Sequence, residues 1–113
     1  MALTIWHNPR CSKSRATLAL LQECGLAPQV RLYLEAPPSR AELQAALAKL
    51  GAPAATLVRW GEKDRPEALT KEAGEGEILD ALTANPRLIE RPLVMTETTA
   101  RLGRPPEAVL DIL

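Results

Sequence analysis

The 113-residue chain has few of the residues from which metal sites, disulfide scaffolds and aromatic cores are built. It contains two cysteines, one histidine and no phenylalanine, and only 3% of its residues are aromatic. One histidine and two distant cysteines cannot supply the three or four ligands of a zinc site, so we expect no metal. Cys11 and Cys24 would lie about 20 Å apart along one expected helix, beyond disulfide reach. Leucine, valine, isoleucine and alanine must therefore fill the core.

An excess of one charge and long apolar runs are also missing. The chain has 14 basic and 14 acidic residues, so overall charge does not favour nucleic acid or an anionic membrane as a partner. No apolar run approaches the ~20 residues of a membrane span. The N-terminus lacks the basic-then-apolar pattern of a secretory signal. We therefore expect a cytoplasmic monomer with reduced thiols, folded as one domain over residues 1–113.

The pattern along the chain predicts a small α/β fold. The expected elements are a strand over 2–6, a helix over 12–24, a strand over 30–34, a helix over 39–50, short helices over 54–59 and 75–83, strands over 93–95 and 99–102, and a helix over 107–113. The short β-α-β opening implies a parallel strand pair joined by a right-handed crossover. About 53–85 has no strand signal and is interpreted as a helical insertion. The result is a mixed four-stranded sheet flanked by helices.

The stretch 7–15, His-Asn-Pro-Arg-Cys-Ser-Lys-Ser-Arg, is typical of a site for a nucleophilic thiol. Cys11 falls on a strand-to-helix turn, where helix N–H groups and neighbouring cations stabilise a thiolate. His7 either pairs with that thiolate or is a partly buried histidine bonded to backbone, and both interpretations stay open. Ser14 completes Cys-x-x-Ser and leaves no local resolving thiol, so an outside thiol would have to clear any adduct. Cys24, on the apolar face of the same helix, is expected to be a small core residue.

Three arginines far apart in the sequence are candidates for anion binding. Arg91 and Arg104 stand at element ends, where side chains can converge, and guanidinium groups suit tetrahedral oxyanions. Arg59 stands in the less regular insertion. Each taken alone is more commonly a solvated surface side chain. A Cys-x5-Arg phosphatase loop is excluded, because Thr17 occupies the position of its arginine.

Four stretches together identify a family. Residues 7–15, 32–35 (Leu-Tyr-Leu-Glu), 90–94 (Glu-Arg-Pro-Leu-Val) and 103–107 (Gly-Arg-Pro-Pro-Glu) closely resemble the glutaredoxin-coupled arsenate reductase (ArsC) family. The resemblance is nearest to its small arsenate-reductase-like branch, which is related to the Spx proteins. It implies a thioredoxin-like fold with a helical insertion, and a cis peptide bond before Pro92.

The resemblance also implies a mechanism. Arsenate or a similar oxyanion binds beside the thiolate, which attacks arsenic and expels water or hydroxide. Glutathione attacks the adduct, glutaredoxin removes the glutathione, and hydrolysis releases arsenite. Glutathione is thus a co-substrate, and no bound cofactor is expected. The implied site residues are Cys11 and His7 as catalytic groups, with Ser14, Arg59, Arg91 and Arg104 binding substrate.

Two other functions compete with arsenate reduction. One is a thiol-dependent reductase or transferase acting on another substrate. The other is a redox-responsive transcription regulator that binds RNA polymerase, as Spx proteins do. Many such regulators have Cys-x-x-Cys as a switch, and Ser14 argues against that switch here. Arg91 and Arg104 favour oxyanion chemistry.

Overall fold

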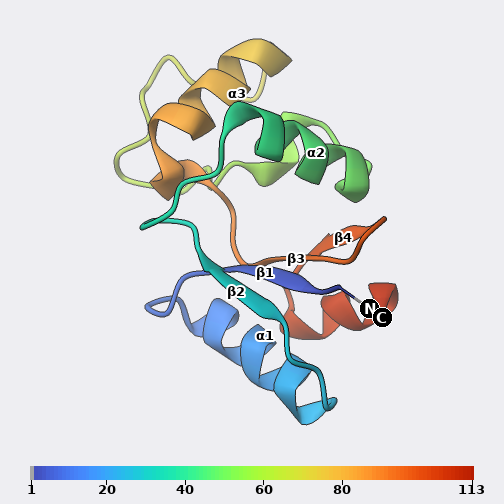
Figure 1. The fold of residues 1–113 in the computed structure, drawn as a ribbon. Coiled ribbons are helices and arrows are strands. Elements are labelled where there is room, and N and C mark those ends of the chain that lie inside the picture. The colour runs from blue at the N-terminus through green and yellow to red at the C-terminus, as the bar shows by residue number, and fades with distance from the viewer. Residues whose placement is uncertain (1) are drawn as a thin grey trace.

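The computed structural model describes residues 2–113 and contains a mixed sheet. The strands are β1 (Thr4–His7), β2 (Gln29–Leu32), β3 (Leu93–Met95) and β4 (Ala100–Leu102). Their order is β2-β1-β3-β4, with β1 parallel to β2 and the other two pairs antiparallel (Figure 1). The predicted α/β fold with a mixed four-stranded sheet and a parallel opening pair is confirmed.

Helices cover both faces of this sheet (Figure 1). On one face lie α1 (Ser12–Glu23) and the 3-10 helix η3 (Pro106–Ile112), packed on Ile5 and Val94. On the other lie α2 (Arg40–Leu50) and α3 (Glu75–Ala84), with the short η1 (Ala54–Leu57) and η2 (Pro86–Leu88). Trp6 and Leu93 face this second layer. Successive strand residues point to opposite faces, so β1 and β3 each contribute to both apolar clusters, Ile5 and Val94 on one face and Trp6 and Leu93 on the other.

The start of α2 is a capping box. The Ser39 hydroxyl accepts a hydrogen bond from the Glu42 N–H at 3.1 Å, and the Glu42 carboxylate accepts one from the Ser39 N–H at 3.0 Å. The helix ends at Gly51, whose φ of 67° is left-handed. Both ends of α2 are therefore set by local sequence.

The prediction that Cys24 is a core residue is wrong. Its side chain is exposed, and α1 ends one residue earlier, at Glu23. Cys24 continues the spacing of the buried residues Ser14, Thr17 and Leu21, and its N–H still donates to the Leu20 carbonyl at 3.1 Å. It lies outside the apolar cluster on this face, because the chain turns at the next residue, Gly25, where φ is 79°.

The last helix differs from the prediction in type, because η3 is a 3-10 helix over its whole length. Between α2 and β3, an isolated antiparallel bridge joins Val58 to Ile89. The Arg59 N–H donates to the Leu88 carbonyl at 2.7 Å, and the Glu90 N–H donates to the Leu57 carbonyl at 2.7 Å. This bridge ties η1 to the segment that leads into β3. No helix within residues 2–113 has the length and apolar character needed to cross a membrane.

Candidate active site

Cys11 is the N-cap residue of α1, directly after the loop that leaves β1. Its backbone is extended, with φ of −95° and ψ of 122°. The loop is closed by a hydrogen bond from the Cys11 N–H to the Asn8 carbonyl at 3.0 Å, and the Asn8 side chain accepts from the Arg10 N–H at 3.0 Å. The thiol is half-buried. Local hydrogen bonds therefore hold the sulfur at the positive end of a helix.

The surroundings of Cys11 favour its thiolate. Burial raises the pKa of the Cys11 thiol. The Ser14 N–H, the Arg91 charge and the Lys13 N–H lower it, and together they outweigh burial, so that the pKa lies below its ordinary value. The side chain does not form a capping hydrogen bond. The stabilisation thus comes from N–H groups at the helix end and a guanidinium far away in sequence, the environment that makes cysteines nucleophilic.

His7 and Ser14 form a buried pair next to this thiol. The Ser14 hydroxyl accepts a hydrogen bond from the Asn8 N–H at 3.0 Å and lies 2.6 Å from His7 Nδ1. Burial and, to a lesser extent, the charge of Arg15 lower the pKa of His7, which favours the neutral ring. With the Asn8 N–H donating to the Ser14 oxygen, the hydroxyl proton is best directed at Nδ1, which leaves the histidine proton on Nε2. His7 is therefore bonded to the first turn of α1 rather than charged.

Arg91 reaches the same place from the other end of the chain. It is 8% exposed and precedes Pro92 through a cis peptide bond, as the family resemblance implied. The Arg91 Nη1 atom lies 3.4 Å from Glu90 Oε1. Its Nε is buried without a hydrogen-bond partner among the described residues. A buried guanidinium N–H without an acceptor is costly, which marks this position as a place for an anion.

Arg104 contacts Arg91, whereas the Arg59 side chain pairs with another residue. Arg104 Nη1 donates to the Arg91 carbonyl at 2.9 Å and lies 3.5 Å from Glu90 Oε1. Arg104 is also followed by a cis proline, which was not predicted from the sequence. Arg59 is bonded to Glu62 Oε2 at 2.7 Å, and more than a third of its side chain is exposed. The structure thus brings Arg91 and Arg104 together directly.

Tyr33 links Arg59 to this site, a role that was not predicted from the sequence. Burial raises the pKa of Tyr33, Arg91 and Arg59 oppose the increase, and the Cys11 thiolate adds to it. The Tyr33 hydroxyl therefore lies within the electrostatic range of all three groups. A signal was present in the sequence. Tyr33 follows β2 directly, and the carboxyl ends of parallel strands meet at one edge of a sheet.

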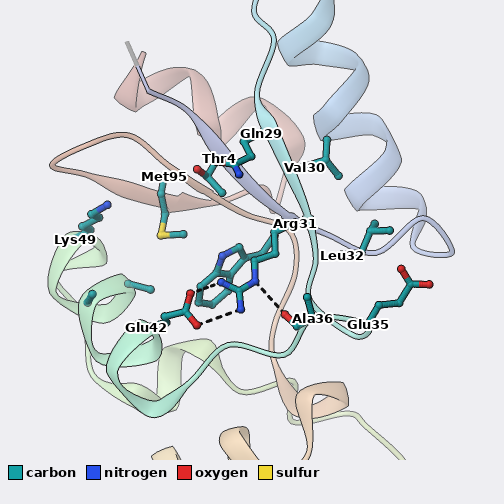
Figure 2. A pocket seen from close by; sticks show the side chains of 13 residues that line it. Thr4, Gln29, Val30, Arg31, Leu32, Glu35, Ala36, Glu42, Lys49 and Met95 are labelled. Carbon is teal, nitrogen blue, oxygen red and sulfur yellow. Dashed lines mark hydrogen bonds and ion pairs between the residues drawn. The ribbon is translucent and has the colours of Figure 1, made fainter.

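Two cavities lie near β2. One of about 300 Å³ borders the loop before Cys11 and is lined by His7, Asn8, Pro9, Arg10, Leu32, Leu34 and Glu35. Another of about 600 Å³ lies between β2 and α2, where the Arg31 side chain is bonded to Glu42 and to the Ala36 carbonyl (Figure 2). Neither Cys11 nor the three candidate arginines line this second cavity, so it is separate from the candidate active site.

Within residues 2–113 no three or more histidine, cysteine or acidic side chains gather as a metal would require. The candidate active site supplies several reactive groups of its own. It has a thiol favoured as thiolate, a neutral histidine and converging guanidinium groups. Such an arrangement can bind an oxyanion and present a sulfur nucleophile to its central atom.

Known proteins resemble this chain in sequence and fold. A solved structure from Vibrio cholerae, described as an arsenate reductase, is 44% identical, superposes with a TM-score of 0.94, and matches 100% of this chain and 98% of its own. A Rhizobium meliloti arsenate reductase is 46% identical over 120 residues, covering 100% of this chain and 82% of the relative. The Escherichia coli K12 protein YfgD, described as uncharacterized, is 45% identical over 112 residues, covering 96% and 94%. The ArsC family matches residues 6–112. This chain belongs to the ArsC family.

Proposed function

We propose that this protein reduces arsenate to arsenite through an adduct on Cys11, with glutathione and glutaredoxin as the outside reductants. The observation that carries the proposal is the buried, unpartnered Nε of Arg91 beside a thiol whose pKa is lowered. An oxyanion bound there would accept from Nε and stand next to the nucleophile. The two relatives described above as arsenate reductases support the same substrate.

In this proposal the arginines bind the substrate. Arg91 contributes a buried guanidinium, and Arg104 is fixed beside it by its hydrogen bond to the Arg91 carbonyl. Arg59 is more exposed and bonded to Glu62, so it would have to rotate towards the oxyanion. Guanidinium groups donate pairs of hydrogen bonds to tetrahedral anions, which explains why arginine rather than lysine suits these positions.

The proposed reaction has four steps. The Cys11 thiolate attacks arsenic, a sulfur–arsenic bond forms, and an arsenate oxygen leaves as water after taking up protons. Glutathione forms a second sulfur–arsenic bond and displaces another oxygen as water. The glutaredoxin thiolate attacks the glutathione sulfur, and the electron pair of that sulfur–arsenic bond stays on arsenic, which falls from the +5 to the +3 state. Hydrolysis of the remaining bond releases arsenite and the Cys11 thiol.

Dependence on outside thiols follows from where the two cysteines lie. Cys24 is exposed at the far end of α1, about 20 Å from Cys11 at 1.5 Å per residue. Ser14 occupies the position one turn from Cys11 where a resolving thiol would stand, and its hydroxyl is bonded to His7. Neither residue can close a disulfide with Cys11. The cytoplasm, which keeps a pool of reduced glutathione, is therefore the proposed compartment.

A coupled assay tests this function. Arsenate-dependent oxidation of NADPH is measured with glutathione, glutaredoxin and glutathione reductase present. The unaltered protein and Cys24→Ser should both support turnover, whereas Cys11→Ser should not. Cys24→Ser is the matched control because it removes the other thiol of the chain.

The proposal fails if the unaltered protein gives no arsenate-dependent oxidation, or if Cys11→Ser is as active as Cys24→Ser. In the first case, recovery of RNA polymerase on the immobilised protein would favour the regulator instead. Activity with another oxyanion in place of arsenate would favour the broader class of thiol-dependent reductases.

A further inference from the structure

Glu90 places a carboxylate oxygen where an oxyanion oxygen would be expected. Its Oε1 atom lies 3.4 Å from Arg91 Nη1 and 3.5 Å from Arg104 Nη1. The same oxygen accepts the Arg91 backbone N–H at 3.3 Å. One oxygen is thus surrounded by two guanidinium groups and a main-chain donor. About four-fifths of the Glu90 side chain is removed from solvent, its exposed fraction being 21%.

Hydrogen bonds hold the main chain of Glu90 next to the arginines. The Glu90 N–H is bonded to the Leu57 carbonyl at 2.7 Å, next to the Val58–Ile89 bridge. Arg104 is held by the Arg91 carbonyl at 2.9 Å. The main chain of Glu90 is therefore held beside both arginines, and its carboxylate can move only by rotation about the side-chain bonds.

The contacts that Glu90 makes are long for ion pairs. Charge-assisted hydrogen bonds of this kind normally measure about 2.7–2.9 Å. In the same molecule, Arg59 and Glu62 are joined at 2.7 Å, a length that indicates a closed pair. Glu90 stands 3.3–3.5 Å from each of its three donors, and Arg91 Nε finds no acceptor within residues 2–113. Glu90 thus compensates the charge of the arginines without saturating their donors.

We propose that Glu90 is the resident counter-anion of the oxyanion site and sets its preference for the charge of the ligand. With the site empty, Glu90 compensates the two guanidinium charges, which would otherwise be costly at a buried position. With an oxyanion bound, the same carboxylate repels it. Coulomb repulsion is proportional to the product of the charges, so a divalent anion is penalised about twice as much as a monovalent one. The inference rests on the proposed function only in placing the oxyanion at Arg91 and Arg104.

The test uses inorganic sulfate as the divalent probe and nitrate as the monovalent one. Dissociation constants are measured by titration calorimetry at constant ionic strength for the unaltered protein, Glu90→Gln and Asp64→Asn. Glutamine keeps the shape and an acceptor oxygen but removes the charge. Asp64→Asn is the matched control, because it makes the same change in net charge at an exposed carboxylate paired with Arg87.

We expect Glu90→Gln to bind sulfate about tenfold more tightly, which corresponds to about 1.4 kcal/mol. For nitrate we expect half that free energy, which corresponds to a roughly threefold lower dissociation constant. Asp64→Asn should change neither constant. If Glu90→Gln is too unstable to titrate, Glu90→Asp withdraws the carboxylate by one methylene and should shift sulfate binding in the same direction by a smaller factor.

Three results would overturn the inference. They are sulfate binding to Glu90→Gln that is unchanged or weaker, equal gains for sulfate and nitrate, and no sulfate binding by any variant. Weaker binding would mean that Glu90 positions the arginines for the ligand rather than competing with it. The failure of the proposed function is recognised separately. If the protein does not turn over arsenate but the variants show the expected sulfate affinities, only the proposed reduction is refuted. If turnover is normal but the sulfate dissociation constants do not change, only the role of Glu90 is refuted.

Discussion

Replacing Ser14 by alanine tests whether the buried hydroxyl organises the candidate active site. Ser14 is completely buried, and its oxygen bonds both the Asn8 N–H and His7 Nδ1. Alanine keeps the backbone N–H that points towards Cys11 and removes only these two hydrogen bonds. The substitution therefore separates the role of the hydroxyl from the role of the main chain.

The magnitude follows from the two groups left without a partner. A buried polar group that loses its partner costs about 1–3 kcal/mol. The bond to His7 is fully buried, whereas the bond to Asn8 is partly exposed, so water can replace some of the latter. We expect Ser14→Ala to lower the free energy of unfolding by roughly 2–4 kcal/mol. For a chain of this length that is a fall in Tm on the order of 10 °C.

Thermal and urea unfolding of Ser14→Ala and Ser12→Ala measure this effect. Ser12 lies in the same turn of α1 but is exposed, so its replacement should change stability by less than about 0.5 kcal/mol. Equal stability of the two variants would refute the structural role of the hydroxyl. The pH profile of Cys11 alkylation provides the second readout. Because the Ser14 N–H remains, we expect the profile of Ser14→Ala to keep its midpoint below that of a free thiol, about pH 8.5.

Two further predictions concern stability. A Cβ at Gly103 would stand 2.8 Å from Pro92 Cγ and clash with the Thr17 hydroxyl, so Gly103→Ala should cost about 1–3 kcal/mol in urea unfolding. Adding Thr17→Ala to Gly103→Ala should recover part of that loss. If the two substitutions change the free energy of unfolding in a strictly additive way, the clash is contradicted. The Arg31 guanidinium lowers the pKa of Glu42 to about 2. That stabilisation is present above the unfolded pKa of ~4.3 and is lost as pH falls towards 2. Since both side chains are partly exposed, Glu42→Gln should cost about 1 kcal/mol at pH 7 and nothing near pH 2, whereas a pH-independent loss would contradict the pairing.

Local sequence determined the order of elements and most of their ends. The capping box at Ser39, the left-handed Gly51 and the turn before Cys11 act over a few residues, so their effects can be read directly from the chain. The position of Cys11 at a helix N-terminus is of this kind. It needs only a strand, a short loop and a helix in succession.

The local sequence pattern did not predict where a helix ends when its apolar spacing continues past the last helical residue. The apolar spacing of α1 continues through Cys24, but the helix stops at Glu23 and the cysteine becomes exposed. The C-terminal segment kept helical spacing yet formed a 3-10 helix. In both cases the signals that predict a helix do not specify how its last turn is closed.

What only the tertiary structure decided is which distant side chains meet around the thiol. The sequence by itself determined the candidates Cys11, Arg91 and Arg104, because each stands at the end of an element. The sheet register then placed Tyr33 among them, and the bridge between Val58 and Ile89 set Glu90 against the two arginines. Register and bridging depend on contacts between segments far apart in the chain. For that reason the nucleophile could be found in the sequence, and the carboxylate that faces its anion site could not.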